Sequence, residues 1–133
     1  MRGRALVLAL ALAVPAPAWA QDLLDAEAFE AQVTGYTITF QQFGRHFGTE
    51  QYLPGRQVRW RAAENLCQHG TWFPQGEAIC FVYDHDPTPH CWHFWLDGGA
   101  LVARSVLDQP GAELHAAERS TEPLACPGPD LGV

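Results

Sequence analysis

The stretch 80–95, CFVYDHDPTPHCWHFW, gathers more chemistry-bearing side chains than any other part of the sequence. Its tip carries two carboxylates and two imidazoles, from Asp84, His85, Asp86 and His90. Carboxylates and imidazoles bind zinc and copper, so one hypothesis for the tip is a metal site. An Asp-x-Asp-Pro pattern is equally typical of an ordinary turn, and we favour this second interpretation.

Two cysteines flank the tip and favour a stapled hairpin over a metal centre. In a symmetric hairpin centred between positions 85 and 86, Cys80 lies directly opposite Cys91. Facing Cα atoms of antiparallel strands are about 4.5–5.5 Å apart, a separation that a disulfide tolerates. In the same strand His90 and His93 are three residues apart and point to opposite faces, so they cannot share one ion.

The cysteine count predicts two disulfides in an exported chain. The four are Cys67, Cys80, Cys91 and Cys126. With Cys80–Cys91 formed, Cys67–Cys126 follows by elimination and would attach the Pro- and Gly-rich tail to the domain. Four cysteines allow three connectivities, and the other two remain open at this level. The absence of a CxxC pair argues against a zinc ribbon and a thioredoxin-type redox motif.

Residues 1–20 have the layout of a secretory signal peptide. Arg2 and Arg4 precede a short apolar run, and small residues lead up to Ala20. The run is shorter than the roughly 20 residues that span a bilayer. We therefore expect cleavage after Ala20, a single mature domain at 21–133, a location in the periplasm or outside the cell, and no membrane insertion after cleavage.

The mature part is strongly acidic. Without the two signal-peptide arginines, six arginines face fifteen acidic residues, a net charge of −9, and the chain contains no lysine. Such a surface repels phosphate backbones and anionic membranes, so nucleic acid is not an expected partner. We interpret the charge as a solubility feature of an exported protein.

The chain between the signal and the tail reads as one helix followed by strands. Residues 22–35 predict a short helix, which Asp25 can cap and Gly35 can end. The apolar side chains that share one helical face are Ala26, Phe29 and Val33. Short β-branched and aromatic segments follow, separated by turn signals. They cover 36–40, 49–53, 58–61, 67–73, 78–83, 90–96, 100–106 and 112–117.

This spacing predicts a mainly β fold, an antiparallel meander of about eight strands closed or curled into a barrel, half-barrel or sandwich. GTWFPQGEAICFVY with a second cysteine in an aromatic strand, TGYTITF after an acidic helix, and the closing CPGPDLGV resemble small exported bacterial proteins of a domain-of-unknown-function type. The resemblance covers most of the mature chain. It implies a lipocalin-like β-meander and brings no activity and no catalytic residue.

Aromatic residues supply the candidates for ligand binding. The tryptophans that could line a pocket for an apolar ligand or a sugar ring are Trp60, Trp72, Trp92 and Trp95. The competing interpretation, which we favour, is that a domain of this size needs them as core. An eight-stranded barrel can either fill with side chains or hold one small ligand.

No pattern in the sequence predicts an enzyme or a cofactor. Ser105 and Ser120 are the only serines, and neither lies in a Gly-x-Ser-x-Gly elbow. The expected function is a non-enzymatic binding or accessory module, whose partner is a small apolar ligand or another periplasmic protein. The alternative is a zinc- or copper-binding protein that uses the 84–90 loop, and a hydrolase ranks third.

Overall fold

The computed structural model describes residues 11–14, 21–62 and 66–126. Within these ranges the chain forms one helix and eight strands. They are α1 (Ala26–Val33), β1 (Thr37–Gln42), β2 (Arg45–Leu53), β3 (Gln57–Arg61), β4 (Gln68–Gln75), β5 (Ala78–Tyr83), β6 (Asp86–Asp97), β7 (Ala100–Ser105) and β8 (Leu114–Ser120). Apart from 11–14, the predicted signal peptide lies outside the described residues.

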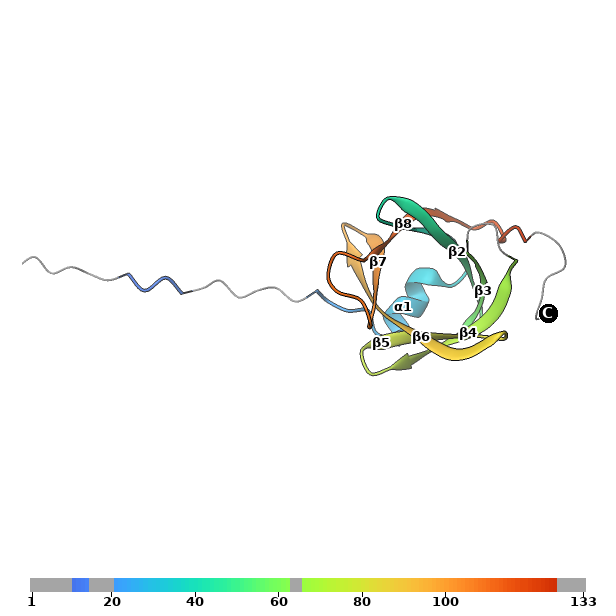
Figure 1. Ribbon diagram of the computed structural model, residues 1–133, viewed down its shortest axis with the longest axis horizontal. Coiled ribbons are helices and arrows are strands. Elements are labelled where there is room, and N and C mark those ends of the chain that lie inside the picture. Colours follow the sequence, from blue (N-terminus) through green and yellow to red (C-terminus); the bar gives the residue numbers. More distant parts are fainter. Residues whose placement is uncertain (1–10, 15–20, 63–65, 127–133) are drawn as a thin grey trace, which may run out of the picture.

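The strands form a closed antiparallel barrel in sequence order, as Figure 1 shows in a view down the ring. Each strand pairs with the next, and β1 also pairs with β8 to close the ring. The mainly β prediction is confirmed, and of the three predicted arrangements the closed barrel is the one that forms. The proposed hairpin register is also confirmed near the staple, where Cys80 faces Cys91 and Ile79 faces Trp92.

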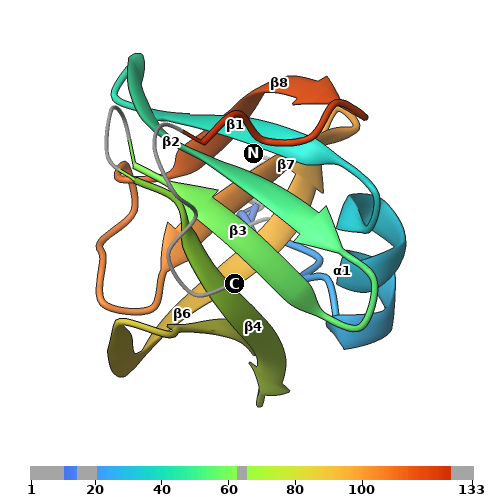
Figure 2. The ribbon, with the colours of Figure 1, turned by 90° about the vertical axis from the view of Figure 1, so that its right-hand side faces the viewer.

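Helix α1 lies across one end of the barrel: it is in the middle of the ring in the view of Figure 1 and at one end of the strands in Figure 2. The predicted cap is confirmed, since the Asp25 carboxylate accepts a 2.8 Å hydrogen bond from the backbone N–H of Ala28. Gly35 follows the helix with φ of 87°, a conformation that costs glycine little. The helix spans Ala26–Val33, inside the predicted segment 22–35 and directly after the predicted cap. None of the described helices is long and apolar enough to cross a bilayer.

The inward face of α1 fills one end of the barrel. Phe29 and Val33 are fully buried, as the apolar stripe predicted. The Phe29 ring lies 5.0 Å from the Trp72 ring and 4.4 Å from the Phe94 ring, measured between centroids. Aromatic rings at such distances stabilise each other beyond their burial. The helix is therefore an apolar plug at this end of the barrel.

The β1–β2 hairpin is longer than the sequence indicated. Residues 41–48 were not assigned to strands, yet β1 continues to Gln42 and β2 begins at Arg45. The turn is made by Phe43 and Gly44, both with positive φ. The pairing register then shifts next to Phe40, and residue 47 is left as an extra residue in β2.

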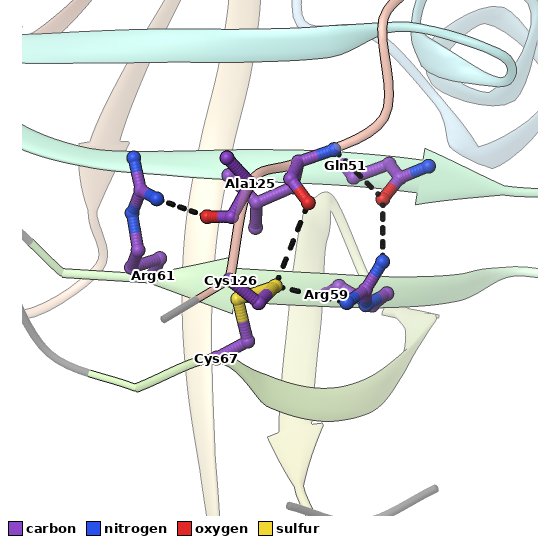
Figure 3. Close-up of a disulfide and its surroundings, with 7 residues drawn as sticks. Gln51, Arg59, Arg61, Cys67, Ala125 and Cys126 are labelled. Carbon is purple, nitrogen blue, oxygen red and sulfur yellow. Dashed lines mark hydrogen bonds between the residues drawn. A yellow bond between two sulfur atoms is a disulfide. The ribbon is translucent and has the colours of Figure 1, made fainter. Parts of the chain in front are cut away.

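The last described segment is attached to the outside of the barrel, as Figure 3 shows. The disulfide Cys67–Cys126 forms as predicted, and Cys80–Cys91 is the second. Arg61 donates a hydrogen bond to the carbonyl of Ala125, and the backbone N–H of Leu124 donates to Gln51 Oε1 at 3.2 Å. The segment is thus held on β2 and β3 by polar contacts as well as by sulfur.

Candidate ligand-binding site

A cavity of about 190 Å³ occupies the end of the barrel that α1 does not fill. Eight aromatic residues line it: Phe40, Phe47, Tyr52, Trp60, Phe81, Tyr83, Trp92 and Phe94. The polar lining consists of Glu50, Gln68, Asp86 and His90, and Ala103 and Leu114 complete the wall. An aromatic wall with a few converging polar groups is the usual composition of a small-molecule site.

The hairpin of β5 and β6 supplies much of the aromatic lining. Period-two alternation along these two strands puts Ile79, Phe81, Tyr83, His90, Trp92 and Phe94 on one face. All of them except Ile79 line the cavity, so this face is the interior of the barrel. The predicted register fails only near the tip, where a shift pairs the last residue of β5 with the first residue of β6.

Trp60 reaches into the cavity because Gly48, two residues before its cross-strand partner Glu50 on β2, has no side chain. A Cβ atom built on Gly48 would lie 2.2 Å from the Trp60 indole, a distance that real atoms do not adopt. The bulge beside Gly48 turns Phe47 toward the same space, with its ring 5.8 Å from the Trp60 ring and 6.2 Å from the Trp92 ring. These three partly buried rings, which we call the aromatic triad, form one cluster in the cavity wall.

A second glycine allows Tyr83 to cross a neighbouring strand. A Cβ atom on Gly70 would lie 2.7 Å from the Tyr83 ring and 2.5 Å from the Val82 carbonyl oxygen. Because Gly70 leaves this space open, the Tyr83 ring lies over β4 and points toward β2. Its hydroxyl donates a 2.9 Å hydrogen bond to Glu50 Oε1.

Glu50 is the most unusual residue of the cavity. Its side chain is 2% exposed, and Oε2 has no hydrogen-bond partner among the described residues. Burial raises the pKa of Glu50 well above its ordinary value, and the hydrogen bond from Tyr83 opposes this only in part. A buried carboxyl oxygen without a partner costs free energy, so it marks a place where an incoming group can gain it.

The two tyrosines next to Glu50 keep their phenol protons. Burial raises the pKa of Tyr52 well above 10.0, and the nearby Glu50 carboxylate raises it further. Burial and the same carboxylate raise the pKa of Tyr83 in the same direction. Tyr83 therefore acts as a hydrogen-bond donor to Glu50 and not as a base.

An acid–imidazole pair lies at the solvent side of the cavity. His90 Nε2 lies 2.9 Å from Asp86 Oδ2, and the backbone N–H of Thr88 donates to Asp86 Oδ1 at 3.0 Å. The hydrogen bond from His90, followed by those from Thr88, lowers the pKa of Asp86. His90 is exposed and Gln68 is partly buried, so this polar rim is the solvent-facing part of the lining.

The four tryptophans predicted to bind ligand separate into two groups. Trp60 and Trp92 line the cavity. Trp72 packs against Phe29 in the filled end of the barrel and does not line the cavity. Trp95 is buried outside the cavity lining, with the Arg104 guanidinium 5.7 Å from its ring.

The residues predicted to bind metal also separate. Asp86 and His90 contact each other, whereas Asp84 Oδ2 lies 3.3 Å from Nδ1 of His69, a residue that spacing alone did not connect to it. His85 is exposed in the two-residue turn, and the expected 84–90 loop is mostly part of β6. Within the described ranges, no three His, Cys, Asp or Glu residues gather as metal ligands. Zinc or copper binding stays a prediction.

No family model, curated protein or solved structure matches this chain. The cavity is therefore the basis for a functional hypothesis. The residue that sequence reasoning missed is Glu50, which was placed in a strand but given no role. Its one sequence signal is the pattern Gly48-x-Glu50-x-Tyr52, in which a charged residue shares a strand face with an aromatic one.

Proposed function

We propose that this protein is a binding module that takes up one small, largely apolar molecule inside its barrel. The observation that carries the proposal is the aromatic-lined cavity of about 190 Å³ next to a buried, incompletely bonded carboxyl. A cavity of about 150 Å³ suffices for a benzene molecule, so the fitting ligand is about the size of a single ring. Long acyl chains and multi-ring cofactors exceed this space.

The lining supports binding better than catalysis. Tyr83 is engaged as a donor to Glu50, and Asp86 and His90 contact each other at the rim. Glu50 and His90 also lie at different depths of the cavity, since Glu50 is 2% exposed to solvent and His90 is exposed. They are therefore poorly placed to act together on one bound molecule. Aromatic walls instead supply contact area and shape, which determine affinity for a small ligand.

A thermal-shift titration with benzyl alcohol tests the proposal. At ten times the dissociation constant, a ligand specific for the folded state adds about 1.4 kcal/mol to the free energy of unfolding. For a domain of this size that is a rise in Tm of about 6 °C. Tryptophan fluorescence should change in parallel, because Trp60 and Trp92 line the cavity.

A matched pair of substitutions on β7 locates the binding. Ala103→Leu adds three carbon atoms to the cavity wall, whereas Ala100→Leu makes the same change at an exposed position of the same strand. We expect the first variant to lose the ligand-dependent rise in Tm and the second to keep it. Saturable binding that is equal in both variants, or no binding by the wild type, would refute the cavity as the site.

We also propose that the protein is exported and folds in an oxidising compartment as a lipocalin-like barrel. The support is the pairing of all four cysteines, Cys67 with Cys126 and Cys80 with Cys91, together with the signal-like start of the sequence. Mass spectrometry of unreduced protein from the periplasmic fraction should find a chain that begins at Gln21 and contains both bridges. A chain that keeps its first residues and free thiols would contradict export.

A further inference from the structure

The side chains that line the cavity include carboxyls but neither arginine nor lysine. Glu50 and Asp86 contribute carboxyls, His90 contributes an imidazole, and no arginine is among the lining residues, while lysine is absent from the whole chain. Such a lining provides no fixed cation that could pair with an anionic ligand. It favours a ligand that brings the positive charge itself.

The unpaired carboxyl oxygen of Glu50 determines which hydrogen-bonding group a ligand should bring. Tyr83 already donates to Oε1, so once Glu50 is ionised its Oε2 still lacks a hydrogen-bond donor. An ammonium group supplies N–H donors and the opposite charge together, and such charge-assisted hydrogen bonds are about twice as strong as neutral ones. A quaternary ammonium has no N–H and leaves the same oxygen without a partner.

The aromatic triad offers a second contact of the same preference. Phe47 lies within 6.2 Å of both Trp60 and Trp92, and Trp60 is the direct cross-strand neighbour of Glu50. The faces of tryptophan and phenylalanine attract cations within about 6 Å, and more strongly where water is excluded. A cation bound to Glu50 would therefore lie beside aromatic rings that also stabilise it.

We propose that the cavity selects a small organic cation, a primary or secondary ammonium carried on an apolar body of about one ring. This inference rests on the proposed function and specifies its ligand class. Glu50 accepts the ammonium hydrogen bond, the aromatic triad surrounds the charge, and the apolar wall of the cavity holds the ring.

The pH dependence of binding follows from the state of Glu50. Because burial raises the pKa of Glu50 well above its ordinary value, an ammonium that binds there competes with the proton of the carboxyl. Affinity for the cation therefore rises with pH by up to tenfold per unit until Glu50 is ionised. The other titratable groups that line the cavity are Tyr52, Tyr83, Asp86 and His90.

Three probes of similar size but different charge test whether the charge of the ligand determines its affinity. Benzylammonium, benzyl alcohol and benzoate are titrated into the full-length mature protein by calorimetry at several pH values. We expect benzylammonium to bind at least tenfold more tightly than benzyl alcohol at neutral pH, with the difference shrinking as the pH falls. Benzoate should bind weakest, and tetramethylammonium should gain little because it offers no donor to Oε2.

Glu50→Gln is the decisive variant, because it keeps the size of the side chain and removes the charge. It should bring benzylammonium to the affinity of benzyl alcohol and abolish the pH dependence, whereas Asp97→Asn, at the exposed end of β6, should change neither. A pH dependence that persists in Glu50→Gln but disappears in His90→Gln would assign the effect to the rim and overturn the role given to Glu50.

The outcomes also separate this inference from the proposed function. If benzyl alcohol binds and benzylammonium binds no more tightly at any pH, the cation preference is wrong while the cavity remains a binding site. If none of the probes binds, the proposed function fails as well. The wild-type pH series decides the first point without any variant, so loss of folding in Glu50→Gln would leave the test intact.

Discussion

The buried carboxyl of Glu50 makes the stability of the ligand-free protein depend on pH in an unusual direction. In the unfolded chain this group ionises near its ordinary pKa of 4.5, whereas in the folded barrel burial raises the pKa well above that value. Between the two pKa values the folded state holds a proton that the unfolded state has lost. The free energy of unfolding therefore falls as the pH rises through this window, by up to about 1.4 kcal/mol per pH unit.

Glu50→Gln removes this dependence and leaves the surroundings in place. The amide oxygen can still accept the 2.9 Å hydrogen bond from Tyr83, but the side chain no longer ionises. The difference in unfolding free energy between variant and wild type should therefore grow in favour of the variant by up to about 1.4 kcal/mol for each pH unit inside the window. In thermal unfolding this corresponds to about 6 °C per pH unit.

Urea unfolding of both proteins between about pH 4 and about pH 8 measures the effect. Glu118→Gln, the same substitution at an exposed position of β8, is the matched control and should leave the shape of the wild-type curve unchanged. Parallel curves for wild type and Glu50→Gln would show that Glu50 is not held neutral by burial. A wild-type stability that instead increases with pH across the window would show that the sign is wrong.

Three further substitutions probe the construction of the cavity. Gly70→Ala should displace the Tyr83 ring, which lies 2.7 Å from the added atom. Urea unfolding should then show a free energy of unfolding lower by about 1–3 kcal/mol. An unchanged ultraviolet spectrum of the tyrosine would contradict this. Phe29→Ala should cost about 3–5 kcal/mol and enlarge the cavity enough to admit a two-ring probe, and continued rejection of that probe would contradict the plug. Removing Cys67–Cys126, whose cysteines are 59 positions apart, should cost about 4 kcal/mol under non-reducing conditions, and a loss near zero would mean that the other contacts hold the segment.

Local signals in the sequence were enough to predict the elements. Asp25 and Gly35 predicted the ends of α1, and both have the expected role. The Cys80–Cys91 pair fixed the register of its hairpin, because a disulfide between facing strands tolerates few alignments. Alternation from that pair then predicted which residues of β5 and β6 share the inner face.

The site itself depends on tertiary features that alternation does not encode. The bulge leaves Phe47 as an extra residue of β2, so its place in the cavity wall could not be read from the strand pattern alone. Likewise Trp72 and Trp60 are both inward aromatic residues on neighbouring strands, but α1 fills only the end that contains Trp72. Nothing in a helix that precedes the strands indicates which end it enters.

Closure of the ring by β1 and β8 has a consequence for how the protein is made. Every other strand pairing joins consecutive segments, whereas this one brings Thr37 opposite Ser120. A growing chain can assemble hairpins early, but it has no sealed interior until its final strand is available. The compartment that first receives the complete polypeptide is therefore also the first in which a guest molecule can be enclosed.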